Sequence, residues 1–220
     1  MLNMIFYIII PYLCLISLII GLIIKITTSK LTISAPATGF FEKERLSIGT
    51  TSWHYGIVFV LIGHILGLLF PTFILELLSD VNMKIGLSLL ALALGFSALF
   101  GVIILLIRRL ITKTVFKTTR FVDIFILCVL LIQVSLGIYI ATNYRWGMGW
   151  YASNVAHYIY SIILLNPKVS LVSTMPFLVG LHFSIGFIIV GLIPYTRLIH
   201  FLYVPYGYIF RKPQLIIYLR

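Results

Sequence analysis

Five long apolar runs dominate this sequence and limit what it can fold into. They cover approximately residues 4–24, 47–70, 83–107, 121–142 and 175–199. A spanning helix needs about 20 apolar residues, and backbone polar groups in lipid must bond internally, so runs of this length indicate transmembrane helices. The sequence therefore predicts an all-α membrane protein, a single membrane-embedded domain over 1–220 built as a bundle of five transmembrane helices.

The composition agrees with this prediction and leaves little chain for a soluble domain. Hydrophobic residues make up 61% of the chain and charged residues only 10%. A net charge of +11 raises the question of nucleic acid, but the basic residues stand at the ends of apolar runs and not on a polar face with interleaved aromatic residues. A role in membrane topology explains them better, and no nucleic-acid partner is expected.

The basic residues also predict the orientation of the bundle, because Lys and Arg of short loops are retained on the cytoplasmic side. Thirteen of the sixteen fall on one side of the membrane. The N-terminus is then outside, and the C-terminus with its tail 201–220 is cytoplasmic. The larger group is Lys25, Lys30, Lys43, Arg45, Arg108, Arg109, Lys113, Lys117, Arg120, Arg197, Arg211, Lys212 and Arg220, and the smaller group is Lys84, Arg145 and Lys168.

Segment 143–174 joins the last two spans on the outer side. It is rich in aromatic residues, and its apolar stretch is too short and too interrupted to span, which is typical of a segment along the membrane interface. His157 lies within it, and we interpret this residue as a surface or loop histidine. Cys14 and Cys128 each fall inside an apolar run and are interpreted as packing residues.

Four histidines lie in the predicted spans, where an ionisable residue is costly enough to indicate function. His54 and His64 are on the second span, and His182 and His200 are on the fifth, which runs the opposite way. At 1.5 Å per residue the members of each set are ~15 Å and ~27 Å apart along their helices. This predicts two pairs at matched depths, His64 with His182 near the outer face and His54 with His200 near the inner face.

The faces of the two helices can be compared by counting turns. Eighteen residues close five turns, so a continuous helix would carry His182 and His200 on one face, whereas the ten residues between His54 and His64 leave them about 80° apart. The histidines of the second span are closer together along their helix than those of the fifth span. Matching both pairs in depth therefore requires tilt of the helices, a kink near Pro194, or an oblique cofactor.

Two imidazoles facing one another suit the axial positions of a haem iron, and bis-histidine ligation favours electron transfer over oxygen chemistry. A porphyrin needs space between helices, and small residues surround the histidines, although they permit helix–helix contact equally well. A single membrane histidine more often bonds a neighbouring helix, but four that pair by depth favour two haems. The small residues are Gly56, Gly63 and Gly67 on the second span and Gly180 and Gly186 on the fifth.

With these histidine spacings, the sequence resembles the gamma subunit of respiratory nitrate reductases, a membrane cytochrome b, over nearly its whole length. The resemblance is strongest in WHYGIVFVLIGHILGLLFP (53–71), LLIRRL (105–110) and MPFLVGLHFSIGFIIVGLIPYTRLIHFLYVP (175–205). It implies that two haems b are bound, one by His54 with His200 and the other by His64 with His182. The outer loop departs from the family pattern, which affects the type of quinone and not the haems.

The resemblance further implies a route for electrons in a bacterial or archaeal cytoplasmic membrane. Quinol, either menaquinol or ubiquinol, is oxidised near the outer haem. Electrons then pass through the inner haem to an iron–sulfur beta subunit and a molybdenum-containing alpha subunit on the cytoplasmic side. The chain is thus expected to be the electron-transfer subunit of a quinol-dependent oxidoreductase, and nitrate is not reduced on it.

The resemblance also suggests further site residues. Lys84 matches a lysine associated with quinol binding in the family, and Gly63 and His64 complete that pocket. From the residues alone, snorkelling of Lys84 to the interface is the preferred explanation. Arg197, one turn before His200, is a candidate partner of a haem propionate, and Arg108 and Arg109 are weaker candidates because topology already explains them.

Three other functions remain open at this point. A haem b anchor of a related quinol-oxidising complex, such as one for dissimilatory sulfite reduction, would differ in its neighbouring subunits. A metal or solute carrier would line a pathway with the histidines, but such carriers usually add carboxylates or thiols at the midplane. A purely structural anchor would not need four histidines in apolar spans.

Overall fold

The computed structural model describes residues 2–28, 44–144 and 147–202, and these residues form helices and turns without a β-strand. Five helical stretches are long and apolar enough to cross a membrane, which confirms the predicted fold class. They are Ile5–Thr28, Glu44–Leu69, Val81–Ile111, Phe121–Asn143 and Phe177–Tyr195. The first stretch consists of the π-helical turn η1 (Ile5–Ile9) and α2 (Ile10–Thr28), and the short helix α1 (Leu2–Met4) precedes it. The next three stretches are the helices α3, α5 and α7.

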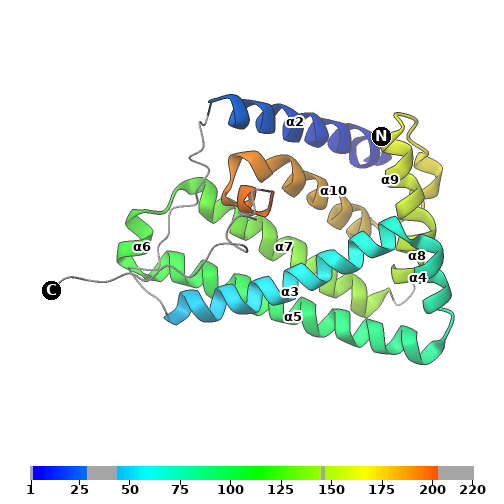
Figure 1. Cartoon of the computed structure of the whole chain (residues 1–220), viewed down its shortest axis with the longest axis horizontal. Coiled ribbons are helices and arrows are strands. Elements are labelled where there is room, and N and C mark those ends of the chain that lie inside the picture. Colours follow the sequence, from blue (N-terminus) through cyan, green and yellow to red (C-terminus); the bar gives the residue numbers. More distant parts are fainter. Residues whose placement is uncertain (1, 29–43, 145–146, 203–220) are drawn as a thin grey trace, which may run out of the picture.

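The long helices lie side by side in the order α3, α5, α7, α10 (Phe177–Leu192) and α2, each packed against the next (Figure 1). One end of the bundle carries the short helices α4 (Pro71–Leu77), α8 (Gly147–Trp150) and α9 (Ala156–Ile163), and we name it the α9 end. The other carries α6 (Lys113–Lys117) and is named the α6 end.

Glycine lets α3 and α5 approach so closely that their backbones touch. A Cβ added to Gly56 would lie 2.4 Å from the backbone nitrogen of Ala98, and one added to Gly101 would lie 2.3 Å from that of Trp53. Neither position therefore tolerates a side chain without separating the helices. Trp53, Ala98 and Val102 form a buried core with residues of α7, which fixes the half of α3 that carries His54.

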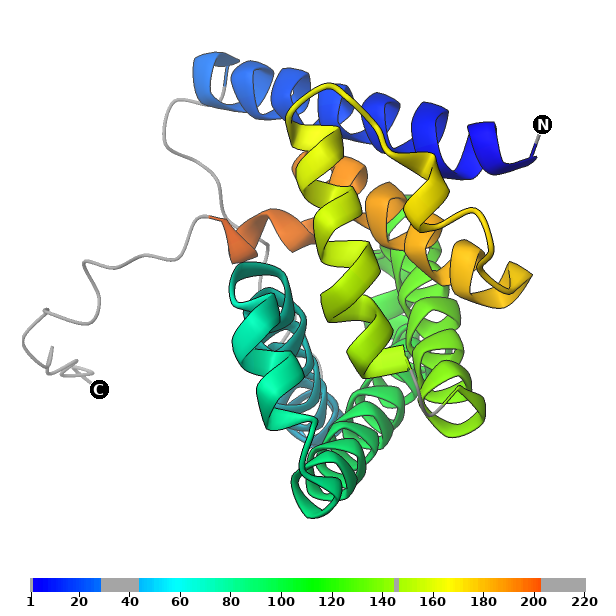
Figure 2. The same cartoon turned by 90° about the vertical axis from the view of Figure 1, so that its right-hand side faces the viewer.

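The segment between α7 and α10 crosses the α9 end of the bundle (Figure 2). It runs through α8, the π-helical turn η2 (Tyr151–Val155) and α9. Tyr158 and Ile162 are 0% and 1% exposed and pack with Tyr7 of η1. The predicted outer loop therefore contains a helical segment that is packed into the protein. Apolar residues at and just after the end of α9, such as Ile163 and Leu164, are exposed, as a location at the membrane interface would require.

The last span breaks earlier than predicted. The α-helix ends at Leu192 and is followed by the 3₁₀ turn η4 (Ile193–Tyr195), by Thr196 in an extended conformation, and by the 3₁₀ turn η5 (Arg197–Phe201). Pro194 has no N–H to continue the helical ladder, and its ring crowds the preceding turn. His182 and His200 therefore do not share one continuous helix, and of the possibilities considered from the sequence the break near Pro194 is the one observed.

The described basic residues gather at the α6 end. Eight lie at or near it and only Lys84 and Lys168 at the α9 end. This is the distribution from which the sequence predicts a cytoplasmic α6 end, and the orientation stays a prediction. Lys30, Lys43, Arg145, Arg211, Lys212 and Arg220 lie outside the described residues, as does the predicted tail from residue 203 onward.

Candidate functional site

The histidine pair predicted near the inner face is brought together at the α6 end. The ring centroids of His54 on α3 and His200 on η5 are 6.0 Å apart, with the ring planes inclined by 61°. Both side chains are exposed in the isolated chain. These two residues are 146 positions apart in the sequence, so the tertiary structure alone makes them neighbours.

The second pair lies nearer the α9 end. His64 is on α3 and His182 is on α10, each in the half of its helix toward this end. A Cβ added to Gly137 of α7 would lie 3.2 Å from Cε1 of His182, so the absence of a side chain at Gly137 makes room for this imidazole. The pairing of His64 with His182 stays a prediction from their depth.

All four imidazoles are oriented by the same kind of bond. In each histidine, Nδ1 lies near a backbone carbonyl oxygen. The distances are 2.7 Å from His54 to Thr50, 2.8 Å from His64 to Val60, 3.1 Å from His182 to Gln133, and 2.6 Å from His200 to Arg197. A carbonyl oxygen can only accept, so each Nδ1 carries the proton and donates it. In the neutral imidazole, Nε2 is then left with a lone pair for a metal ion.

This arrangement fits the haem that the sequence suggests. Histidines that bind a metal usually donate their second ring nitrogen to a carbonyl or carboxylate, as all four do here. Two imidazoles that share one metal ion at about 2 Å place their ring centroids about 6 Å apart, and the separation of His54 and His200 agrees. Within the described residues, no group of three or more His, Cys, Asp or Glu gathers as it would around a bare metal ion.

The predicted glycine stripe of α3 divides into three environments. Gly56 packs directly on the α5 backbone. Gly67 faces the ring of Tyr151, at 3.0 Å from an added Cβ. Gly63 has no atom within 4 Å of an added Cβ, so open space adjoins the helix just before His64. Only Gly63 therefore leaves room for a ligand, and the other two serve helix and loop packing.

Gly180 and Gly186 of α10 also pack against protein. An added Cβ at Gly180 would lie 2.5 Å from the hydroxyl oxygen of Tyr7, and one at Gly186 would lie 3.4 Å from Nε2 of Gln133. Of the five glycines suggested by the sequence, four thus allow a close contact within the described chain.

Lys84 lies in the first turn of α5 at the α9 end, and its side chain is exposed. Asp80 begins this helix, its Oδ1 accepting from the backbone nitrogen of Met83 at 2.8 Å. Counted from the helix ends at 1.5 Å per residue, Lys84 and His64 lie about 5 Å and about 8 Å inside the bundle. The lysine and His64 are thus at similar depths.

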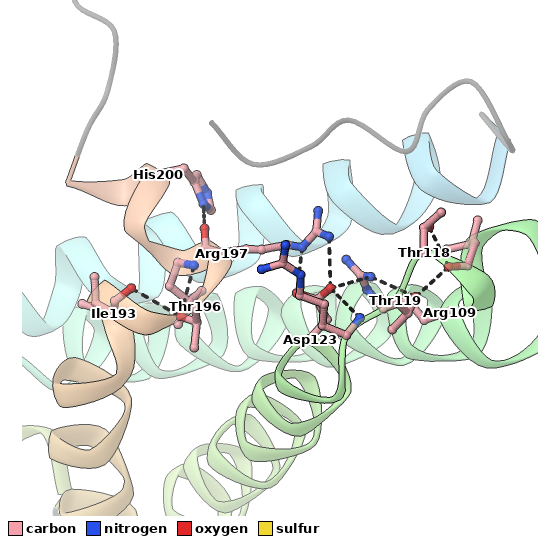
Figure 3. A network of polar contacts seen from close by, with 11 residues as sticks. Arg109, Thr118, Thr119, Asp123, Ile193, Thr196, Arg197 and His200 are labelled. Carbon is pink, nitrogen blue, oxygen red and sulfur yellow. Dashed lines mark hydrogen bonds and ion pairs between the residues drawn. The ribbon is translucent and has the colours of Figure 1, made fainter. Parts of the chain in front are cut away.

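An ion-pair network lies beside His200 at the α6 end (Figure 3). Arg197 donates from Nε to Oδ1 of Asp123 at 2.7 Å and from Nη2 to Oδ2 at 3.0 Å. Arg109 reaches the same Oδ2 at 3.4 Å, and Arg108, one residue before it, is only 2% exposed. Two guanidinium groups thus converge on the Asp123 carboxylate beside His200.

Two residues of these sites were not identified from the sequence. One is Asp123, whose side chain is 6% exposed and pairs with two arginines. An acidic residue at the start of a predicted span, with arginines near other helix ends, is the signal that the sequence offers.

The other missed residue is Tyr151, which contacts His64. Its hydroxyl donates to the carbonyl oxygen of His64 at 3.0 Å, and the rings meet edge-on with centroids 5.4 Å apart. Burial, with a smaller effect from Tyr160, raises the pKa of Tyr151 to about 12, so the hydroxyl keeps its proton and remains a donor. The sequence carries no signal for this contact, because the two residues are 87 positions apart.

His157 lies on α9 with an exposed side chain. It lines a shallow cleft of about 610 Å³ with Tyr160 and Lys168. The interpretation of His157 as a surface histidine agrees with this position.

Comparison with known proteins identifies relatives over nearly the whole chain. A family model described as "Nitrate reductase gamma subunit" matches residues 3–219. The nitrate reductase gamma chain of Bacillus subtilis is 31% identical, with 93% of each chain covered. The gamma chain of respiratory nitrate reductase 1 of Escherichia coli is 29% identical over 98% of this chain and 97% of its own, and that of respiratory nitrate reductase 2 is 29% identical over 98% and 96%.

Proposed function

Because the chain belongs to the nitrate reductase gamma subunit family, we propose that it is the quinol-oxidising cytochrome b subunit of a respiratory nitrate reductase. The family and the five spanning helices make it a multi-pass membrane subunit of a nitrate reductase, which is an oxidoreductase complex. The observation that carries the finer proposal is the common orientation of four imidazoles, each with Nδ1 bound to a carbonyl oxygen and Nε2 left for a metal ion.

In this proposal His54 and His200 hold one haem b, and His64 and His182 hold the other. When bound, the haems supply one-electron transfer between the two ends of the bundle. The carbonyl acceptors keep each imidazole in one tautomer and one orientation, which limits reorganisation when the charge at the metal changes. Held by two histidines each, the haems would supply electron transfer and not oxygen chemistry.

The α9 end supplies the proposed quinol site. The Lys84 ammonium donates a hydrogen bond to a quinol oxygen, and the open space beside Gly63 admits the ring next to His64. Menaquinol and ubiquinol both present such oxygens. The segment through Tyr151 crosses this end of the bundle and bonds to His64.

The α6 end supplies the exit for electrons. The Arg197 and Arg109 guanidinium groups lie near His200 around Asp123, and guanidinium groups suit the propionates that a haem bound there would carry. Arg197 already gives two donors to Asp123, so it would contribute to this site chiefly as a fixed charge. An iron–sulfur beta subunit would dock at this end, and a molybdenum-containing alpha subunit would reduce nitrate.

The predicted orientation determines the energetics. Quinol oxidation at an outer α9 end releases two protons outside, while the electrons move toward the cytoplasm. An electron crossing the full field against the membrane potential costs about 2.3 kcal/mol per 100 mV, so the redox drop to the acceptor must exceed that amount. This separation of charge conserves energy without a proton pump.

The decisive experiment is haem quantification in the detergent-purified chain, with the dithionite-reduced minus oxidised spectrum as readout. The wild type is expected to hold about two b-type haems, and His64→Ala about one, because one axial ligand pair is broken. His157→Ala is the matched control, since it removes an exposed histidine of α9 and should leave the haem content unchanged. A folded wild-type chain without haem would refute the proposal and favour a carrier.

A further inference from the structure

His200 is not placed by a spanning helix. The α-helix of the last span ends at Leu192, and Thr196, with φ −122° and ψ 176°, separates η5 from the turn before it. A residue beyond such a break has no fixed rotation or depth relative to α10. Other contacts must therefore hold His200 at its observed place opposite His54.

Local bonds within η5 attach His200 to Arg197. Nδ1 of His200 donates to the Arg197 carbonyl oxygen at 2.6 Å, and the Thr196 hydroxyl oxygen accepts from the backbone nitrogen of Leu198 at 3.3 Å. These bonds make η5 a unit with a defined imidazole orientation. They do not connect the unit to the rest of the bundle.

The side chain of Arg197 makes that connection. Its guanidinium binds both oxygens of Asp123, 74 residues away, at 2.7 and 3.0 Å (Figure 3). A two-point contact between planar groups fixes direction as well as distance. Because the carbonyl of Arg197 holds His200 and its guanidinium holds Asp123, a single residue links the imidazole to the start of α7.

Asp123 is itself held from two further directions. The backbone nitrogen of Arg120 donates to Oδ2 at 3.3 Å, and Arg109 of α5 reaches the same oxygen at 3.4 Å. Arg109 also bonds the hydroxyl of Thr119 at 3.3 Å. The carboxylate lies in the first turn of α7, where the helix dipole favours negative charge. Asp123 thus joins α5, α7 and η5 at one point.

Apolar packing offers a competing explanation for the position of η5. Ile199 is 7% exposed, and Leu198 packs against the core that contains Trp53. Apolar contacts hold the turn against the bundle but are not directional, whereas the ion pair fixes rotation. The two explanations differ in what they predict for a substitution that removes only the charge.

We propose that Asp123 is a positioning residue, which through Arg197 sets the imidazole of His200 opposite His54. The inference rests on the proposed function, since it concerns a ligand of the haem at the α6 end. It assigns Asp123 no contact with the haem. The Asp123–Arg197 pair fixes the rotation and depth of η5, which a continuous helix through Pro194 would otherwise fix.

The test compares Asp123→Asn with Asp80→Asn in the membrane-bound chain with its partner subunits. Asp80 is the matched control, because it also holds a helix start through a carboxylate, at the opposite end of α5. The readouts are haem occupancy, redox titration and the electron paramagnetic resonance signals of the two ferric haems, which respond to the mutual orientation of the axial imidazoles. His200→Ala identifies the signal of the haem at the α6 end.

Asp123→Asn is expected to shift that signal and lower the occupancy of the same haem, leaving the other haem as in wild type. Asp123→Glu should restore part of the signal, and Asp80→Asn should change neither haem. A rise in the potential without a changed signal would reflect lost charge alone and overturn the positioning role. Unchanged haems, or equal loss of both, would overturn it as well.

Arg197→Lys provides a second variant should Asp123→Asn fail to assemble. It keeps the positive charge but loses the two-point contact, so it should reproduce the signal shift. If both residues act through one contact, Asp123→Asn combined with Arg197→Lys should shift the signal no further than the more affected single variant does. Wild type without haem would refute the proposed function, whereas two normal haems in Asp123→Asn would refute this inference alone.

Discussion

The two histidine pairs are built by different means. His64 and His182 stand on the regular helices α3 and α10, and His182 bonds across to α7 through the Gln133 carbonyl. In the other pair, His54 stands on α3 but His200 stands on a 3₁₀ turn beyond a helix break. The first pair depends on helix packing and the second on a charged contact. We expect the two to respond differently to the same kind of change.

The largest expected effect tests whether the pairs are independent units. His64→Ala combined with His182→Ala removes two ligands of one proposed haem and should leave about one haem per chain, the same as either single change. His64→Ala combined with His54→Ala breaks both pairs and should leave about none. Haem quantification in purified chain distinguishes the two doubles. Equal haem content in them would contradict the pairing.

The next effect separates quinol binding from haem binding. Lys84→Ala removes one charge-assisted hydrogen bond, worth about 1.5–3 kcal/mol, so quinol oxidation should lose about 10- to 100-fold in kcat/KM. The haem spectrum should not change. Lys168→Ala, which removes another exposed lysine of the α9 end, is the control. Normal quinol kinetics in Lys84→Ala would favour simple snorkelling of that side chain.

The two glycines of α3 sharpen the comparison through stability. Alanine at Gly56 would place its Cβ 2.4 Å from the Ala98 nitrogen, so it should force α3 and α5 apart and destabilise the chain by about 1–3 kcal/mol. Alanine at Gly63 meets open space and should leave thermal stability unchanged. Thermal unfolding of the two variants in detergent is the measurement. Equal stability would mean that the α3–α5 contact is not close.

The smallest effect concerns the loop segment that covers the α9 end. Tyr151→Phe removes the hydrogen bond to the His64 carbonyl oxygen, with an expected loss of about 0.5–1.5 kcal/mol in stability. A redox titration should show a shift in the haem of His64 and His182 only. Tyr195→Phe, which removes a hydroxyl bonded to Ser17 on α2, is the control. A shift in the other haem would show that the loop acts on the whole bundle.

Some of this architecture could be read from the sequence. The lengths of the apolar runs gave five spans, with ends that differ from the observed helices by a few residues. Depth along a helix follows from residue count, and the pairing of His54 with His200 that it predicts agrees with their ring separation of 6.0 Å, whereas the pairing of His64 with His182 stays a prediction. The course of the last span was wrong beyond Leu192, because the counting assumed an unbroken helix through Pro194.

The glycines illustrate where such reasoning ends. Gly56 and Gly63 lie on one helix seven residues apart and look alike in the sequence, yet one touches the backbone of α5 and the other faces open space. Rotation about the helix axis decides between these environments. That rotation depends on the side chains of the neighbouring helices, which no local pattern contains.

The sequence by itself determined the membrane-spanning helices, the clustering of basic residues toward one end and the depth of three of the four histidines, because these depend on hydropathy and on the fixed rise of a helix. The tertiary structure alone decided the placement of His200, the pairing of Arg197 with Asp123 and the contact of Tyr151 with His64. These contacts join residues far apart in the chain, and their geometry arises only when helices pack.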